Sequence, residues 1–146
     1  MDQNNYEEIL IQTRKLYILN FGRKLSDQII NDIKTRYKTT VEELHIKVNI
    51  NLKKNIYIQV VDIISSIDKS IFHSNNKIVV NPCGLPFVAM CLIVELHARM
   101  GIFPLVLELF RDKSEDPLFN DFRLRRIIDL ERERQVSRSK MYDNNE

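Results

Sequence analysis

The chain has 146 residues, of which 44% are apolar and 29% are charged, and its formal net charge is +2. This length and balance predict one folded globular domain with its own core, and they exclude a disordered chain. The apolar runs are too short to span a bilayer, and the polar start of the chain does not resemble a signal peptide. No association with a membrane is therefore expected.

Strand and helix patterns alternate along the first half of the chain. The apolar run over residues 16–21 predicts a buried strand, and residues 44–48 alternate like a half-buried strand. Ser26 is placed to cap a helix whose apolar residues recur at helical spacing, namely Ile29, Ile30, Ile33 and Tyr37. Residues 56–67 carry isoleucine and valine on one stripe, which predicts a second helix.

The second half of the chain continues the alternation. It predicts strands over 77–81, 103–110 and 122–130, a helix over 87–100, and a polar helix from Glu131 onward. In the last strand, Phe122, Leu124 and Ile128 are expected to share one face. The order of elements is typical of a small Rossmann-like α/β domain, with a mostly parallel sheet and helices on both faces. The acidic loop over 112–117 joins the last two strands and predicts an antiparallel edge hairpin.

The chain shows no internal repeat and no linker, so we interpret residues 1–146 as a single domain. Residues 1–14 form a polar N-terminal extension, and residues 131–146 form a basic C-terminal segment. Seven basic and three acidic residues lie between Arg123 and Lys140, which gives this stretch a charge of +4 and leaves −2 elsewhere. The stretch could attract phosphate, or it could be a solvated helix face with i,i+4 pairs, and we favour the second interpretation.

Two cysteines, Cys83 and Cys91, lie eight residues apart in one apolar stretch. This spacing matches neither a metal site nor a disulfide framework, so a reducing cytoplasm is the expected location. No set of ligands for a metal is present, and no cofactor is expected.

The three glycines occupy informative positions, because glycine is costly inside helices and strands. Gly101 follows a predicted helix and is interpreted as its C-terminal cap. Gly22 and Gly84 each follow a strand and precede a helix. If the first and third strands are neighbours, both glycines flank the topological switch point, where helix N-termini can hold an anion. Strand-to-helix turns also use glycine without any ligand, so this alternative stays open.

We call residues 20–24 the first glycine loop and residues 81–86 the second glycine loop. Together they predict two walls of one phosphate-binding crevice. The candidate ligand-binding residues are Asn20, Phe21, Gly22, Arg23, Lys24 and Ser26 in and after the first loop, and Asn81, Pro82, Cys83, Gly84 and Leu85 in the second.

Four stretches carry a resemblance to a known family: LYILNF (16–21), GLP (84–86), ELHARMGIFP (95–104) and IIDL (127–130). They resemble the small stand-alone accessory proteins of type III CRISPR loci, the Csx family numbered fifteen, best over residues 79–130. The resemblance implies a CARF-like Rossmann-like domain that forms a homodimer and binds cyclic oligoadenylate, with cyclic tetra-adenylate as the expected ring. It also implies a role in antiviral defence, where this second messenger activates effector nucleases. A higher assembly bridged by ligand is possible, and long nucleic acid is not an expected partner.

Such a protein either holds the ring or cuts it. Cutting without metal needs a positioned ribose hydroxyl and stabilised phosphate charge, and a general base would help. His97 is expected to be packed near a helix end, Cys83 has no base near it in sequence, and His45 and His73 are isolated. The family pattern has a histidine in the first loop, where this chain has Arg23 and Lys24. No catalytic residue is assigned.

We therefore expect sequestration of cyclic tetra-adenylate, which damps effector activation. The alternative is a metal-independent ring nuclease that yields linear products. A third class, a structural dimer subunit without ligand, also remains open, because the apolar helix over 87–96 could line a dimer interface.

Overall fold

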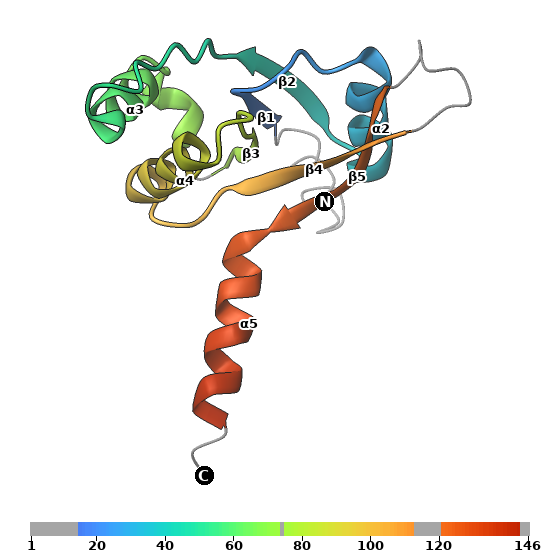
Figure 1. Ribbon diagram of the computed structural model, residues 1–146. Coiled ribbons are helices and arrows are strands. Elements are labelled where there is room, and N and C mark those ends of the chain that lie inside the picture. The colour runs from blue at the N-terminus through green and yellow to red at the C-terminus, as the bar shows by residue number, and fades with distance from the viewer. Residues whose placement is uncertain (1–14, 74, 113–120, 144–146) are drawn as a thin grey trace.

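The computed structural model describes residues 15–73, 75–112 and 121–143, and a five-stranded sheet forms its centre (Figure 1). The strands are β1 (Lys15–Asn20), β2 (Thr40–His45), β3 (Lys77–Asn81), β4 (Leu105–Arg111) and β5 (Phe122–Asp129). Their order is β2-β1-β3-β4-β5, with the first four parallel and β5 antiparallel to β4. The predicted Rossmann-like α/β class with an antiparallel edge strand is confirmed. The polar N-terminal extension and most of the predicted acidic loop lie outside the described residues.

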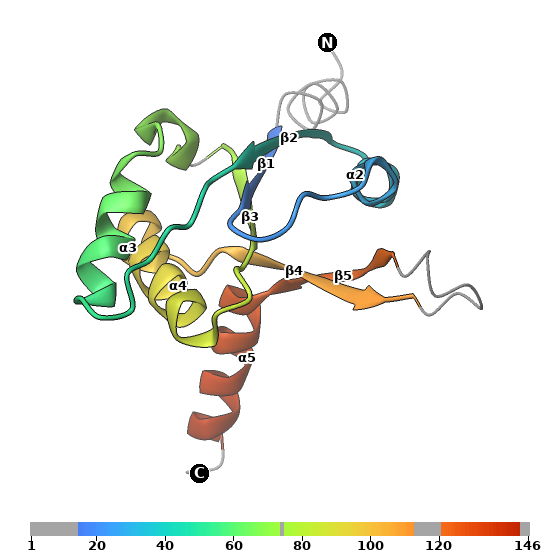
Figure 2. The ribbon, with the colours of Figure 1, turned by 45° about the horizontal axis from the view of Figure 1, so that its top comes forward.

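Helices cover both faces of the sheet, as predicted (Figures 1 and 2). Helix α2 (Asp27–Tyr37) lies on one face, and α3 (Ile56–Ser65) and α4 (Pro86–Met100) lie together on the other, where the short 3-10 helix η1 (Lys69–Phe72) follows α3. Successive side chains of β1 point to opposite faces of the sheet. Ile18 packs in the core beneath α2, whereas Leu19 packs in the core beneath α3 and α4. Two apolar cores therefore hold the sheet between them.

Two of the predicted helix ends are confirmed. The Ser26 hydroxyl accepts a hydrogen bond from the backbone nitrogen of Ile29 at 3.3 Å and caps α2. Gly101 ends α4 with a φ of 75°, and its nitrogen donates to the His97 carbonyl at 2.8 Å. Because this φ is left-handed, glycine is the residue that adopts it at least cost.

Strand β2 begins earlier in the chain than the alternation over 44–48 predicts. It pairs with β1 from Thr40 to His45, and the extended residues after it belong to no strand. Ile46, Val48 and Ile50 are nevertheless partly buried against the α3/α4 core. The alternating pattern therefore reports one-sided burial of an extended segment, which does not require pairing with a neighbouring strand.

The prediction that Ile128 shares a face with Phe122 and Leu124 is wrong. The register jumps from Glu108↔Arg126 to Leu109↔Leu124, so Arg125 is an extra residue on β5. Such a bulge reverses the alternation beyond it. Ile127, rather than Ile128, consequently packs with Phe122 and Leu124 in the core beneath α2.

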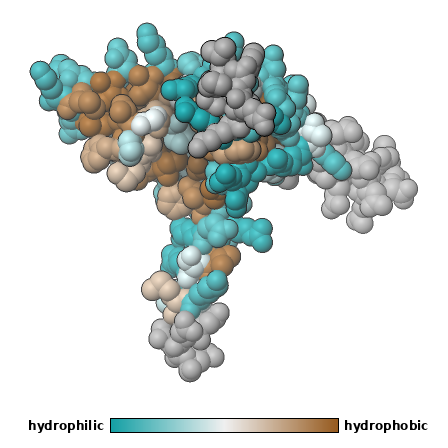
Figure 3. Space-filling model, turned by 45° about the vertical axis from the view of Figure 1, so that its right-hand side comes forward, coloured by the Kyte–Doolittle hydropathy of each residue, from teal (hydrophilic) through white to brown (hydrophobic). Residues whose placement is uncertain are grey.

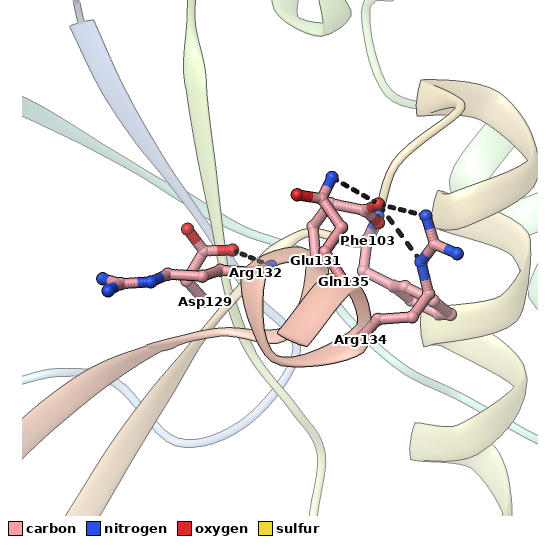
Figure 4. A network of polar contacts seen from close by, with 6 residues as sticks. All are labelled: Phe103, Asp129, Glu131, Arg132, Arg134 and Gln135. Atoms are coloured by element: carbon pink, nitrogen blue, oxygen red, sulfur yellow. Dashed lines mark hydrogen bonds and ion pairs between the residues drawn. The ribbon is translucent and has the colours of Figure 1, made fainter. Parts of the chain in front are cut away.

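Helix α5 (Leu130–Asp143) continues from β5 and projects away from the sheet (Figures 1 and 2). The Glu131 carboxylate anchors its first turn, because it accepts from Nη2 of Arg134 at 2.6 Å and from the Phe103 nitrogen at 3.1 Å (Figure 4). Arg134 first and then this backbone bond lower the pKa of Glu131 to about 2. The predicted polar C-terminal helix is confirmed. No helix in the described ranges is long and apolar enough to cross a membrane.

Candidate functional site

The carboxyl ends of β1 and β3 form the topological switch point of the sheet. The two strands are paired neighbours, from Leu16↔Lys77 to Asn20↔Asn81. The chain leaves β1 toward α2 on one face, and it leaves β3 toward α4 on the other. Ligands of open α/β sheets bind in the crevice that such divergence creates. The prediction of a crevice depended on the first and third strands being neighbours, and they are.

A cavity of about 300 Å³ lies at this point, and both glycine loops line it. Gly22, Arg23 and Lys24 come from the first loop, and Asn81, Pro82 and Gly84 come from the second. The remaining wall is apolar and comes from α2, the segment before it and the edge hairpin, through Leu25, Ile29, Leu107, Leu109 and Phe122. The cavity therefore combines a cationic rim with an apolar wall.

Asn20 organises the first glycine loop from behind the cavity. Its side chain is 0% exposed, and its Oδ1 accepts from the Gly22 nitrogen and from Nδ2 of Asn81, both at 2.9 Å. Its Nδ2 donates to the Arg23 carbonyl at 2.8 Å and to Oε1 of Glu43 at 3.2 Å. All amide capacity of Asn20 is used within the protein. Asn20 thus positions the loop and has no free group for a ligand.

Gly22 is required where the two loops approach each other. A Cβ at this position would lie 2.9 Å from the Pro82 carbonyl oxygen and 3.2 Å from Nδ2 of Asn81. The Phe21 nitrogen also donates to the Asn81 carbonyl at 2.9 Å. The Phe21 ring is buried in the α3/α4 core and does not line the cavity. Phe21 therefore joins the loops through its backbone.

The cations of the first loop face solvent. Arg23 and Lys24 are both exposed, and neither forms an ion pair with any described residue. The guanidinium carbon of Arg23 lies 5.9 Å from the centre of the Phe122 ring. Ser26 lies outside the cavity lining, and its hydroxyl caps α2. The charge of the rim consequently comes from Arg23 and Lys24.

The second glycine loop is more open than the first. A Cβ added to Gly84 would meet no atom within 4 Å. Helix α4 begins at Pro86 after Leu85, and no side chain caps it. The nitrogens of Phe87 and Val88 lack partners in the helix, because the first turn of any helix leaves its N–H groups unpaired. Such an N-terminus favours an anion.

Cys83 and Leu85 do not line the cavity. Cys83 is half-buried against the α3/α4 core, and its Sγ lies 3.6 Å from the Leu85 carbonyl oxygen. Leu85 is exposed beside the start of α4. The structure therefore gathers six of the eleven candidate residues at the cavity, and it places Asn20, Phe21, Ser26, Cys83 and Leu85 around it.

Of the three histidines, His45 comes nearest to the cavity. The register Asn20↔His45 brings it beside the first loop, where its Nε2 lies 3.2 Å from the Gly22 carbonyl oxygen. His45 therefore has a contact with the first glycine loop that its isolated position in the sequence did not indicate. It lines a neighbouring hollow of about 560 Å³, together with Lys47 and the carboxylates Glu43 and Asp68. Those carboxylates make the larger hollow a poor match for a polyanion.

His97 lies near the opposite end of α4, where its ring centre is 4.2 Å from that of Phe103. This confirms the expectation that it is packed at a helix end. Within the described ranges, no three His, Cys, Asp or Glu side chains lie close enough to hold a metal ion. Among the described residues, the ionisable side chains that line the cavity are the cations Arg23 and Lys24.

The sequence did not predict the apolar wall of the cavity. Of its residues, only Ile29 belongs to a pattern that was recognised, the apolar stripe of the first helix. Leu107, Leu109 and Phe122 belong to the edge hairpin, which lies far from both loops in sequence. The antiparallel pairing of this hairpin was predicted, but the pattern gave no indication that it reaches the switch point.

The fold and cavity define a small Rossmann-like protein with a cationic crevice at its switch point. Comparisons with family models, with curated proteins and with solved structures found no match to the chain.

Proposed function

We propose that this protein binds cyclic oligoadenylate, with cyclic tetra-adenylate as the ring, and holds it intact. Sequestration of this messenger would damp the effectors of type III CRISPR defence. The observation that carries the proposal is one cavity with a cationic rim, two converging glycine loops and an apolar wall. The sequence resemblance to the type III accessory proteins supplies the identity of the ring.

The rim matches the phosphates of such a ligand. Arg23 and Lys24 are exposed and have no carboxylate partner among the described residues, so their charges are available. The uncapped start of α4 follows Gly84, which lines the cavity, and a ligand that extends past Gly84 could meet its unpaired backbone N–H groups. Charge-assisted bonds of this kind are among the strongest that a protein offers to phosphate.

The volume of the cavity favours two copies of the chain for each ring. At about 300 Å³, it lies at the small end of the range of roughly 300–1,000 Å³ that ligand pockets occupy. One such cavity has room for part of a four-nucleotide ring. A two-fold symmetric ring can be shared between the matching sites of a homodimer.

Helix α4 offers a surface for that homodimer. Phe87, Met90 and Val94 follow helical spacing and are 59%, 59% and 53% exposed. The stripe begins directly after the second glycine loop, so pairing two such stripes would bring two cavities near each other. Figure 3 shows apolar residues gathered on the body of the molecule, whereas the projecting α5 carries mostly hydrophilic ones. Exposed apolar patches of this kind commonly mark interfaces.

Holding is favoured over cutting by the side chains present. A cut needs a group that removes the proton of the ribose hydroxyl, and the described lining contains no carboxylate, imidazole, thiol or hydroxyl. A metal-independent ring nuclease is the second candidate, because His45 lies at the first loop. Its Nε2 is engaged by the Gly22 carbonyl oxygen at 3.2 Å and would have to leave that contact to act as a base.

The test mixes the pure protein with labelled cyclic tetra-adenylate and follows binding, products and the mass of the complex. We expect saturable binding, intact ring after many complex lifetimes, and two chains for each ring. Multiple-turnover release of linear adenylate would instead establish the ring nuclease. Absence of binding would reject both ligand functions and leave a structural dimer subunit.

A further inference from the structure

Phe122 connects the edge hairpin to the cavity. It is the first residue of β5, it pairs with Arg111 at the end of β4, and its half-buried ring forms part of the cavity wall. Two guanidinium groups lie near this ring, that of Arg23 at 5.9 Å and that of Arg111 at 5.5 Å from its centre. The ring thus lies between the first glycine loop and the hairpin.

A second arginine–phenylalanine contact on the same hairpin provides a contrast. The guanidinium of Arg125 lies 5.1 Å from the Phe110 ring, but Arg125 also lies 3.8 Å from the Glu108 carboxylate. Neither Arg23 nor Arg111 forms an ion pair within the described part of the chain. The Phe110 contact is therefore charge-compensated and lies outside the cavity. At Phe122, by contrast, Arg23 lines the cavity and Arg111 lies beside the phenyl group that lines it, both without an ion pair.

We infer that Phe122 stacks on a base of the bound nucleotide, and that Arg23 and Arg111 bind the phosphates on either side of it. This inference rests on the proposed function and adds a base subsite to it. Leu107 and Leu109 extend the apolar surface beside the ring. Aromatic rings stack with any base, and guanidinium planes bind phosphate and also stack. The subsite therefore takes a nucleotide unit, with the base on the hairpin and phosphate at the loop.

The experiment compares two probes, cyclic tetra-adenylate and inorganic tripolyphosphate, which carries charge without a base. Phe122→Leu keeps an apolar side chain but loses the stacking face. We expect this substitution to weaken binding of cyclic tetra-adenylate roughly 10-fold, because one stacked base is lost, and to leave tripolyphosphate binding unchanged. Phe122→Tyr should restore ring binding. Arg111→Ala should weaken both probes and reduce the salt dependence of binding.

Phe110→Leu is the matched control, because it removes a phenyl group that contacts an arginine on the same hairpin but lies outside the cavity. This variant should bind both probes as the wild type does. Thermal melts of all variants confirm folding. If the wild type binds the ring and Phe122→Leu binds it equally well, the base subsite is wrong while the proposed function stands. If the wild type binds tripolyphosphate but not the ring, or binds neither probe, both the proposed function and the subsite are overturned.

Discussion

The first glycine loop is held by side chains from three strands, whereas the second is held only where it begins. Asn20 and Asn81 join β1 to β3, and Glu43 and His45 of β2 bind the first loop from the other side. Beyond Asn81, the second loop leaves open space around Gly84 and an uncapped helix start. One wall of the cavity is therefore pre-organised by internal hydrogen bonds, and the other keeps open space at Gly84.

The largest expected effect comes from removing the side chain that holds the first loop. Asn20→Ala leaves the buried Asn81 amide and the partly buried Gly22 nitrogen and Arg23 carbonyl without their partner. We expect the free energy of unfolding to fall by about 3 kcal/mol, the cost of unsatisfied buried polar groups, as measured by urea denaturation. Asn49→Ala, at an exposed asparagine, is the control and should change little. Wild-type stability in Asn20→Ala would refute the role of Asn20.

A matched pair of glycine substitutions separates the two loops. Gly84→Val adds a side chain in open space at the cavity, so it should keep the fold and the proposed dimer but abolish the proposed binding of cyclic tetra-adenylate. Gly22→Val drives a Cβ against the Pro82 carbonyl and should cost about 1–3 kcal/mol of stability. Thermal melts and ring titrations measure both effects. Full affinity in a folded Gly84→Val protein would place the site elsewhere.

Lys24 distinguishes holding from cutting at the first loop. If it only holds phosphate, Lys24→Ala should weaken binding by about 2 kcal/mol for each half-site, the loss of a charge-assisted hydrogen bond. If it stabilises a transition state, the substitution should slow cleavage far more than it weakens binding. Lys34→Ala removes the same charge from the exposed side of α2 and controls for net charge. If the wild type cleaves the ring with turnover, and Lys24→Ala loses this cleavage but keeps binding, the proposal that the protein only holds the ring is contradicted.

The smallest effect is expected from α5, which belongs to neither loop. Because β5 is antiparallel to β4, its last residue Asp129 lies opposite Leu105, the first residue of β4. Helix α5 therefore starts at the end of the sheet opposite to the cavity. Deletion of residues 136–146 should leave ring affinity and its salt dependence unchanged, as measured by titration at several salt concentrations. Weaker binding with a shallower salt slope would assign the basic segment a part in ligand capture.

The sequence alone was sufficient to predict the elements whose pattern is local. Ser26 caps α2, Gly101 ends α4 and residues 77–81 form β3, because capping chemistry, backbone freedom and apolar runs act over a few residues. The order of these elements also predicted the parallel sheet and the antiparallel edge hairpin. The two glycines after strands located the switch point once their strands proved to be neighbours.

Only the tertiary structure decided which distant residues meet there. Strand register brings His45 to the Gly22 carbonyl and Phe122 to the cavity wall, and a bulge at Arg125 exchanges Ile128 for Ile127 in the core. Alternation shows that a strand has a buried face, but it does not identify the partner strand or the residue opposite. Asn20 illustrates the same limit. Its position after a strand suggested an amide for a ligand, and only the packing of β1 between β2 and β3 directs that amide to the protein's own backbone.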